Sequence, residues 1–302
     1  MRYFEIKLDR LLRINLIGRQ IFTPPQIHVT RFAPEYIMYA VESGNLYLEV
    51  NGKEITLGER DIYFFKKGEF HKPLQSSSCV YYYIHFRDDE IREYNMPEAE
   101  YHKKLTEKKK EYLKFDKFNT DRYNCLSALV SERYHITNKG LFDHITDIIK
   151  KNFFSEINHD PESLVNMSNS VASIFLKLEN IYSDEKPDKA YYKVKKIKDF
   201  IDKNYAESFN SNDIEKEFLI SFDYANRLFT GIIGCSIFKY RNIARINNAK
   251  IKIMTSNSTI SEIANETGYE SISYFSRIFK KYEGLSPSDY QRRMLEFKEV
   301  NL

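Results

Sequence analysis

One stretch near the end of the chain, residues 260–287, constrains the fold more than any other. Its apolar Ile263 and small Ala264 predict a first helix that can cross a second one closely. Gly268 predicts a tight turn, because glycine adopts a positive φ without steric cost, and Ser271 is a typical residue to start the next helix. The stretch therefore predicts a helix-turn-helix unit.

The second helix of this unit shows apolar side chains at the spacing of one helical face. We expect that face to be buried, and its members are Tyr274, Phe275, Ile278 and Phe279. The opposite face is expected to point outward, and its members are Ile272, Ser273, Ser276, Arg277 and Lys280. The pattern thus predicts a helix with one apolar and one exposed, partly basic side.

The same pattern occurs a second time, 50 residues earlier. Seven residues, namely Ser221, Tyr224, Arg227, Phe229, Gly234, Ser236 and Tyr240, correspond in order to Ser271, Tyr274, Arg277, Phe279, Gly284, Ser286 and Tyr290. In the first helix of each unit the offset is 49, so the second unit carries one extra residue in its turn. Such self-similarity at a fixed period indicates a duplicated structural unit.

With these motifs, residues 190–295 resemble the AraC family of bacterial transcription regulators. The resemblance is carried by the Ile-Ala, Gly-Tyr, Tyr-Phe-Ser-Arg, Phe-Lys-Lys and Gly-Leu-Ser-Pro elements of the closing stretch. It implies two helix-turn-helix units, each placing its second helix in the major groove of DNA. It also implies a long linking helix, here about residues 236–254, whose Arg245 and Ala249 fit the family pattern.

The resemblance further implies which side chains read bases. These are Asp223, Tyr224, Asn226 and Arg227 in the first unit and Ile272, Ser273, Ser276 and Arg277 in the second, and Lys280 is added as a DNA contact. A linking helix of about 19 residues spans about 28 Å, close to the roughly 34 Å between successive major-groove faces. One chain is therefore expected to read two adjacent grooves. The alternative is a helical bundle whose polar faces are merely solvated.

The first unit departs from the family pattern. Glu215 stands where the family favours Ala, and Leu219 stands where it favours Gly. A Glu at a helix crossing is accommodated only by tilting outward. Asp223 places a negative charge near DNA, where it could accept a hydrogen bond from cytosine N4 or cap its own helix. We therefore expect the first unit to contribute less DNA affinity than the second.

The distribution of charge supports a DNA partner for the C-terminal part. The chain has 302 residues and a formal net charge of +3. Residues 190–302 hold 18 Lys and Arg against 14 Asp and Glu, a net charge of +4, which leaves −1 for the rest. Because this basic excess is modest, we expect DNA affinity to need both units or a dimer.

The composition also constrains the compartment. No apolar run approaches the roughly 18 residues that cross a bilayer, and charges scattered through the first 13 residues are unlike the apolar core of a signal peptide. The three cysteines, Cys79, Cys125 and Cys235, lie far apart, which favours reduced thiols over a disulfide scaffold. We expect a cytoplasmic protein.

The first ninety residues predict a small β domain. Short strands are expected at residues 36–41, 45–50, 53–56, 61–65 and 80–86. Asn51 and Gly52 predict a two-residue hairpin, since a type I′ turn requires a positive φ at both central positions. Regularly spaced short strands indicate a sandwich or a barrel.

Part of this region resembles the cupin-type sensor barrel that precedes the DNA-binding part in many AraC-family members. Residues 58–65, 68–71 and 83–86 carry the resemblance. Residues 68–71 match half of the metal pattern of cupin metalloenzymes. The other half, a His-x-His with a following Glu, is missing, because residues 31–44 contain no histidine and His28 stands alone. A metal needs three or four ligands held together, so we expect no metal, no cofactor and no enzymatic activity.

A sensor barrel should contain a concave, partly aromatic cavity with a few polar groups. The candidate ligand-binding residues are Tyr39, Tyr47, His71, Tyr83 and His85. Aromatic and hydroxyl-rich pockets suit sugars, so a carbohydrate is the first expectation for the effector, largely by family analogy. The alternative for each tyrosine is a place in the barrel wall with its hydroxyl in water.

The middle of the chain changes to a helical period, with long helices expected at about residues 140–154 and 161–182. In the second of these, apolar residues recur at alternating spacings of three and four, and they are Leu164, Met167, Val171, Ile174, Leu178 and Ile181. Such a narrow seam suits pairing with one other helix. The partner is either the same helix of a second subunit, giving a homodimer, or a surface of its own chain.

These observations predict an α+β protein in four parts. They are a cupin-like ligand-sensing barrel at 1–95, a helical dimerisation segment at 96–183, a linker at 184–190 and an all-α domain of two helix-turn-helix units at 191–302. The expected function is a transcription regulator that binds double-stranded promoter DNA in response to a small molecule. The family implies an activator that contacts RNA polymerase. The alternatives are a cupin enzyme fused to a DNA-binding domain and a DNA-binding regulator without a ligand.

Overall fold

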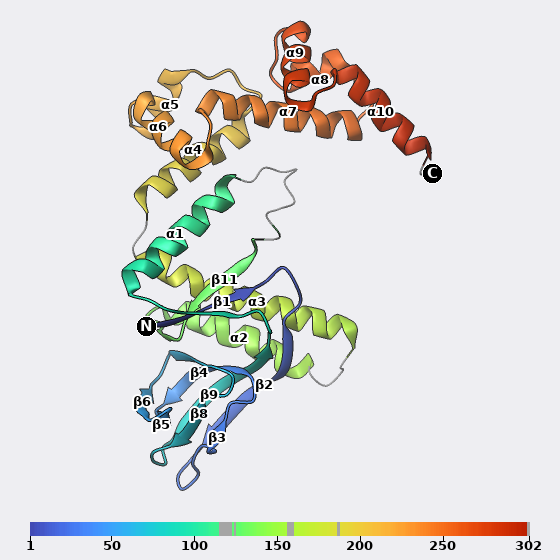
Figure 1. Cartoon of the computed structure of the whole chain (residues 1–302). Helices are drawn as coiled ribbons and strands as arrows, with labels where there is room; N and C mark the ends of the chain where they lie inside the picture. Colours follow the sequence, from blue (N-terminus) through green and yellow to red (C-terminus); the bar gives the residue numbers. More distant parts are fainter. Residues whose placement is uncertain (115–122, 124, 156–159, 186–187, 301–302) are drawn as a thin grey trace. The chain divides into compact units, whose positions relative to one another are not determined.

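The computed structural model describes residues 1–302 except 115–122, 124, 156–159, 186–187 and 301–302 (Figure 1). The chain divides into two compact units. Unit 1 comprises Met1–Leu105 and Tyr123–Lys186, and unit 2 comprises Thr106–Arg122 and Pro187–Leu302. Among the described helices, none combines the length and the apolar content that crossing a membrane requires.

The two units correspond only in part to the four predicted segments. Unit 1 joins the predicted barrel and most of the predicted helical segment into one body. Unit 2 contains the predicted DNA-binding region together with residues 106–122 of the predicted helical segment. Of the predicted linker at 184–190, residues 186 and 187 lie outside the described residues. Helix α3 (Pro161–Glu185) precedes this point, and helix α4 (Lys189–Asn204) follows it.

Unit 1 is rich in β structure. The strands in its described residues are β1 (Arg2–Lys7), β2 (Arg13–Phe22), β3 (Arg31–Phe32), β4 (Tyr36–Gly44), β5 (Leu46–Val50), β6 (Lys53–Leu57), β7 (Asp61–Phe65), β8 (Phe70–Pro73), β9 (Cys79–Arg87), β10 (Arg92–Asn95), β11 (Ser127–Ser131) and β12 (Arg133–His135). They form sheets of three, five and four strands, with the orders β10-β1-β11, β12-β7-β4-β9-β2 and β3-β8-β5-β6. The five strands expected from the sequence are β4, β5, β6, β7 and β9.

The hairpin between β5 and β6 confirms the expected turn. Asn51 has a φ of 48° and Gly52 a φ of 80°, so both central residues are left-handed as a type I′ turn requires. Val50 pairs with Lys53 directly across the turn. The turn therefore fixes the register of the whole β5–β6 pair.

Strand β4 lies in the middle of the five-stranded sheet and is buried on both sides. Ile37, Tyr39 and Val41 belong to the core between the five-stranded and four-stranded sheets. Met38 and Ala40, which point the other way, belong to a second core that also contains residues of helices α2 (Lys139–Ser155) and α3. Alternate residues of one strand thus serve two cores, as the period of two dictates. The walls of the predicted barrel are two separate sheets, one of which is covered by helices (Figure 1).

The apolar seam of α3 lies in this second core. Met167, Val171, Ile174 and Leu178 are buried there against α2 and strands of the three-stranded and five-stranded sheets, and Ile181 is packed against the same cluster. Of the six seam residues, Leu164 is the one classed as exposed, with 47% of its surface open to solvent. The prediction that this seam pairs two subunits is therefore wrong for the four buried residues, and packing within the chain accounts for the spacing.

A further correction concerns the segment predicted to be helical at 96–183. Strand β11 pairs with β1, and β12 pairs with β7, so residues after helix α1 (Glu98–Lys114) return to the sheets. All five residues of β11 are buried. A short, fully buried strand carries no alternation of apolar and polar residues, so periodicity does not reveal it.

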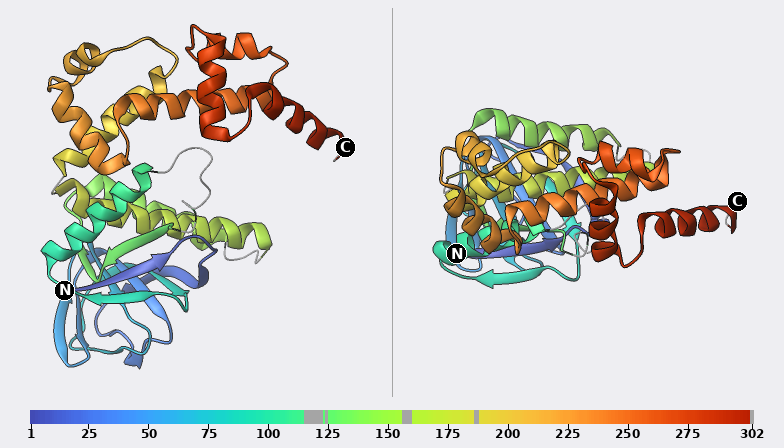
Figure 2. Two further views of the ribbon diagram at one scale, coloured as in Figure 1. Left: turned by 45° about the horizontal axis from the view of Figure 1, so that its top comes forward. Right: turned by 90° about the horizontal axis from the view of Figure 1, so that it is seen from above.

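Unit 2 is helical. After α4 it contains α5 (Ser211–Phe218), α6 (Phe222–Ile233), α7 (Ile237–Thr255), α8 (Ile260–Glu266), α9 (Ile272–Glu283) and α10 (Pro287–Val300). One apolar core joins α4, α5, α6 and the start of α7. Another joins the end of α7 with α8, α9 and α10. Helices α4–α6 and helices α8 and α9 therefore lie at opposite ends of α7, as both views in Figure 2 show.

Candidate DNA-binding interface and ligand pocket

The helix-turn-helix duplication is present in the backbone of unit 2. Ser221 caps the start of α6, and Ser271 caps the start of α9, in each case by accepting a hydrogen bond from the backbone N–H three residues later. Gly234 and Gly284 end these helices with φ values of 89° and 77°, the left-handed cap that favours glycine. The sequence repeat therefore corresponds to a repeat of structure.

Each repeat is closed by the same aromatic contact. The rings of Phe229 and Tyr240 lie 5.5 Å apart, edge to face. The rings of Phe279 and Tyr290 lie 5.5 Å apart in the same arrangement. Both phenylalanines are fully buried, so these pairs fix the second helix of each unit against the helix that follows it.

The outward face of α9 is as expected. Ile272 is 45% exposed, and Ser273, Arg277 and Lys280 are also exposed, while Ser276 is half-buried. The predicted buried stripe needs one correction, because Tyr274 is 41% exposed and belongs to the outward face. Tyr274 lies in the first turn of α9 and lines a groove of unit 2, whereas the neighbouring Phe275 points into the core.

The matching face of α6 is partly engaged inside the protein. Asp223 and Arg227 are exposed, and Tyr224 and Asn226 are half-buried. The side-chain oxygen of Asn226 accepts a hydrogen bond at 3.0 Å from the backbone N–H of Ile237, the first residue of α7. Asn226 thus contributes to joining α6 to α7, a structural task that the corresponding Ser276 is not observed to share.

The two departures in the first unit have distinct structural roles. Glu215 is exposed, and its carboxylate accepts a hydrogen bond at 2.6 Å from the backbone N–H of Phe222, the first residue of α6. A carboxylate at a helix start is favourable, because the N–H groups there lack partners within the helix. Leu219 ends α5 with a φ of 53° and is 87% exposed. Glu215 thus caps the start of α6, and Leu219 adopts a backbone conformation that favours glycine.

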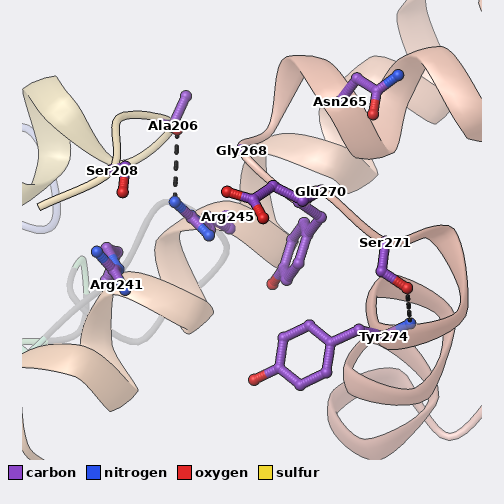
Figure 3. A pocket seen from close by; sticks show the side chains of 10 residues that line it. Ala206, Ser208, Arg241, Arg245, Asn265, Gly268, Glu270, Ser271 and Tyr274 are labelled. Atoms are coloured by element: carbon purple, nitrogen blue, oxygen red, sulfur yellow. Dashed lines mark hydrogen bonds between the residues drawn. The ribbon is translucent and has the colours of Figure 1, made fainter.

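A groove of about 550 Å³ lies between the two halves of unit 2 (Figure 3). The start of α9 forms one wall through Ser271 and Tyr274, and the middle of α7 supplies Arg241 and Arg245. The Arg245 guanidinium donates to the backbone oxygen of Tyr205 at 2.7 Å, just after α4. Its guanidinium carbon also lies 5.3 Å from the ring centroid of Tyr269, which precedes α9. Arg245 therefore ties the first half of unit 2 to the second.

Gly268 permits the close approach at this junction. It has a φ of 84°, and a Cβ atom added to it would collide with the backbone oxygen of Ala206 and lie 2.7 Å from the Arg245 Nη2. The positive φ was expected from the sequence. The contact with the loop after α4 was not, because it joins residues about sixty positions apart.

Unit 1 contains a pocket of about 230 Å³ at one edge of its two larger sheets. Its lining residues are Leu16, Gln20, Phe22, His28, Val29, Arg31, Tyr39, Tyr81, Tyr83 and His85. Three of the five predicted ligand residues, Tyr39, Tyr83 and His85, are therefore brought together. His71 is fully buried just behind the lining, with its ring centroid 5.2 Å from that of His28.

Tyr47 does not join this group. It lies on β5 between Leu46 and Leu48, which point into the core between the sheets. Because neighbouring residues of a strand point to opposite faces, the Tyr47 side chain points away from that core. Its assignment to the ligand site is corrected on this ground.

Arg31 is the pocket residue that sequence reasoning missed most clearly. It lies on the two-residue strand β3, paired with His71 of β8. Its guanidinium is 3.3 Å from the Tyr39 hydroxyl and 3.4 Å from both the His71 Nε2 and the His85 Nε2. A two-residue strand shows no period, so no pattern could assign the direction of its side chains.

The hydrogen bonds around Arg31 define which ring nitrogens carry protons. The His85 Nδ1 faces the Glu35 carboxylate at 3.1 Å and so donates to it, which leaves its Nε2 as an acceptor. The His28 Nδ1 likewise donates to the backbone oxygen of Val29 at 2.8 Å, and its Nε2 accepts from Tyr39 at 2.9 Å. Both rings are thus held as neutral acceptors facing the pocket.

Burial keeps these histidines neutral. Desolvation lowers the pKa of His28 to about 4, with a further decrease from the Arg31 charge. Desolvation, together with the neighbouring His28 and Arg31, lowers the pKa of His71 to about 3. The pKa of His85 is also lowered, chiefly by burial and then by Arg31, although Glu35 opposes the shift. At neutral pH the positive charge of this cluster therefore resides on Arg31.

The sequence matches two known families. Residues 21–129 match the AraC-like ligand binding domain, and residues 215–293 match a helix-turn-helix domain. These segments correspond to most of the sheets of unit 1 and to the helices from α5 to α10 of unit 2.

Relatives match parts of the chain at moderate identity. The uncharacterized HTH-type transcriptional regulator YijO of Escherichia coli (strain K12) is 34% identical over 99 residues, which are 32% of this chain and 34% of that protein. The raffinose operon transcriptional regulatory protein RafR of Pediococcus pentosaceus is 30% identical over 146 residues, 45% of this chain and 52% of that protein. The melibiose operon regulatory protein of Escherichia coli (strain K12) is 28% identical over 103 residues, 34% of each.

The matching part of the chain thus spans between about a third and a half of the length of these relatives. The two family matches agree with the geometry of the two units, since a pocket lies in unit 1 and duplicated helix-turn-helix units lie in unit 2. On these grounds the chain combines a region that matches the AraC-like ligand binding domain with a following helix-turn-helix domain, an arrangement similar to that of AraC-family regulators.

Proposed function

We propose that this chain is a cytoplasmic transcription regulator that binds specific promoter DNA and responds to a small molecule held in unit 1. The observation that carries the proposal is the duplication in unit 2. Two capped helices, α6 and α9, present corresponding side chains from opposite ends of one 19-residue helix, α7.

The spacing of these helices suits DNA. A 19-residue helix is about 28 Å long, and successive major-groove faces of B-DNA recur at about 34 Å. The side chains proposed to contact DNA are those predicted from the sequence, namely Asp223, Tyr224, Asn226 and Arg227 on α6 and Ile272, Ser273, Ser276, Arg277 and Lys280 on α9. Because Asn226 already binds the start of α7, the proposal assigns a larger share of base recognition to α9.

The effector is proposed to occupy the pocket of unit 1. Tyr39, Tyr83 and His85 line it, and its aromatic and hydroxyl groups suit a small polar metabolite. RafR and the melibiose regulator are named for sugar operons, which supports a carbohydrate-like effector for this chain. We assign no catalytic step to the pocket.

Activation of RNA polymerase and a homodimeric state belong to the same proposal. The seam residues Met167, Val171, Ile174 and Leu178 are buried in unit 1. The homodimer is therefore proposed to form through a surface other than this seam of α3. Effector and DNA would be coupled reciprocally, because a ligand shifts an equilibrium only by binding one arrangement more tightly than the other.

The proposal is tested with DNA. A duplex selected from a random library by the purified chain is labelled, and binding is measured by fluorescence anisotropy at a fixed salt concentration. Arg277→Ala should weaken binding by about 5- to 150-fold, since a good arginine–guanine pair contributes about 1–3 kcal/mol. Arg227→Ala should weaken it less. Arg19→Gln, which removes an exposed charge from unit 1, is the control.

Two outcomes would contradict this account in different ways. If the library yields no preferred sequence, or if neither arginine variant binds more weakly than the Arg19→Gln control, the DNA-binding assignment of α6 and α9 fails. If both arginine variants lose the same affinity, specific DNA binding stands, but the smaller contribution of the first unit is wrong.

A further inference from the structure

The pocket of unit 1 contains a charge that its own side chains do not neutralise. Among the ten residues that line it, Arg31 is the one with a permanent charge. In the described part of unit 1, the groups within hydrogen-bonding distance of its guanidinium are neutral, namely the Tyr39 hydroxyl and the His71 and His85 rings. Arg31 is half-buried, and a charge that is partly removed from water without an opposite charge beside it is costly. Arg31 is therefore poised to accept an anionic partner.

The nearest carboxylate in this network is already engaged. Glu35 is 5% exposed, accepts from the His85 Nδ1 at 3.1 Å and forms an ion pair with Arg87 at 2.9 Å. It also accepts from the Asn15 side chain. The imidazole of His85 stands between Glu35 and Arg31, so Glu35 orients that ring and does not pair with the guanidinium.

The guanidinium also keeps donor capacity for a ligand. Its contacts of 3.3 and 3.4 Å are longer than the roughly 2.7–2.9 Å of an arginine–carboxylate hydrogen bond. A guanidinium has five N–H donors in a planar fork that matches the two oxygens of a carboxylate. Three long contacts to neutral acceptors leave this fork available for stronger bonds.

The remaining lining indicates the rest of the ligand. Tyr81 and Tyr83 carry hydroxyl groups, Gln20 carries an amide, and Phe22 adds an apolar ring. The Tyr83 ring lies against β2 because Gly18 has no side chain there, and a Cβ atom at Gly18 would be 2.5 Å from the Tyr83 hydroxyl oxygen. The volume of about 230 Å³ lies below the roughly 300 Å³ at which pockets for drug-sized ligands begin.

We infer that the effector is a small hydroxylated carboxylic acid whose carboxylate is bound by Arg31 inside the pocket of unit 1. This inference rests on the proposed function, since it specifies the effector of that regulator. It replaces a neutral sugar by an acidic one or by another hydroxy acid of similar size. The tyrosine hydroxyls and the Gln20 amide then bind the hydroxyl groups.

The test uses the full chain and matched pairs of compounds. Gluconate, galacturonate and lactate are compared with glucose, galactose and glycerol, and inorganic phosphate is added as a non-carboxylate anion. Thermal shift identifies compounds that raise the melting temperature, and calorimetry gives the Kd. We expect at least one carboxylate to bind while its neutral counterpart does not.

Substitutions locate the site. Arg31→Gln should weaken binding of that carboxylate by about 10- to 100-fold, the range for loss of a charge-assisted hydrogen bond. Arg31→Lys keeps the charge but lacks the fork and should bind with intermediate affinity. Arg19→Gln, an equal change of charge on β2 at an exposed ion pair with Glu42, should bind as the wild type does. Arg31→Lys carries the test if Arg31→Gln does not fold.

Four results would overturn the inference. They are stabilisation by neutral compounds alone, stabilisation by phosphate alone, carboxylate binding that neither Arg31 variant weakens, and no response to any carboxylate. Specific DNA binding is measured on the same preparation, so that a failure of the acidic-effector inference can be distinguished from a failure of the proposed regulatory function. A chain that selects specific DNA but ignores carboxylates refutes the acidic effector alone, and a chain that binds a carboxylate but no specific DNA refutes the regulator.

Discussion

The guanidinium carbon of Arg277 lies 5.2 Å from the ring centroid of Tyr274, three residues earlier on the exposed face of α9. The equivalent pair on α6, Arg227 and Tyr224, shows the same contact at 5.5 Å. A cation placed over an aromatic face is attracted by the ring. In both repeats a tyrosine therefore holds the arginine that is proposed to contact DNA.

Removing this support should weaken DNA binding without unfolding the domain. An exposed cation–π contact contributes about 0.5–1 kcal/mol, so Tyr274→Ala should raise the Kd for a selected duplex by about 2- to 5-fold. Tyr274→Phe keeps the ring and should bind nearly as the wild type does. Anisotropy titrations give the Kd of both variants for the selected duplex. If both variants lost the same DNA affinity, the Tyr274 hydroxyl rather than its ring would be needed.

Leu219 offers a stabilising substitution. A leucine with a φ of 53° is strained, and its side chain is 87% exposed, so little packing is lost on removing it. Leu219→Gly should stabilise unit 2 by about 0.5–1 kcal/mol, after allowance for the entropy that glycine adds to the unfolded chain. Urea denaturation followed by circular dichroism measures the change. Leu295→Gly, at an exposed helical position of α10, should instead destabilise.

Gly268 offers the opposite case. Gly268→Ala combines an unfavourable φ of 84° with a collision against the Ala206 backbone oxygen, and should cost about 2–4 kcal/mol of unfolding free energy. Gly284→Ala is a matched control, because Gly284 has a φ of 77° but no atom within 4 Å of the added Cβ. It should cost only about 1 kcal/mol. If Gly268→Ala and Gly284→Ala lost the same unfolding free energy, the close approach of Gly268 to the Ala206 backbone would be refuted.

The neutral histidines of unit 1 predict a loss of stability in acid. The pKa of His28 is about 4 in the folded chain against 6.5 in the unfolded one, so above pH 6.5 both states are neutral. As the pH falls from 6.5 towards 4 the unfolded state binds the proton first, and folding loses on the order of 3 kcal/mol from this group. Denaturation of His28→Gln should show a shallower pH dependence than the wild type. His144→Gln, at an exposed position of α2, should not.

Local signals gave reliable predictions where one residue type determines the backbone. Asn51 and Gly52 take the positive φ values that the hairpin requires, and the serine caps and glycine ends of α6 and α9 follow the same logic. Each of these features depends on atoms a few residues apart. The repeat at 50 residues then reinforces them, since two copies with the same caps must have the same local fold.

Other features depend on what covers a surface, and spacing alone does not specify that. The α3 seam was correctly identified as apolar, but its spacing fits a second subunit and the sheet of its own unit equally well. Glu215 was expected only to tilt outward, and its capping of α6 depends on the path of the turn between the two helices. Arg31 lies on a strand too short to show a period.

The two-sided burial of β4 and β9 has a mechanical consequence. On β9, Tyr81, Tyr83 and His85 face the ligand side, while Tyr82 and Ile84, between them, lie in the helix-covered core. A molecule that pushes against the first set displaces the same strand that carries the second. Protein interiors are close-packed and have low compressibility, so a displacement of β9 on the ligand side is transmitted to the opposite side of the strand. The helices α2 and α3 pack against that opposite side.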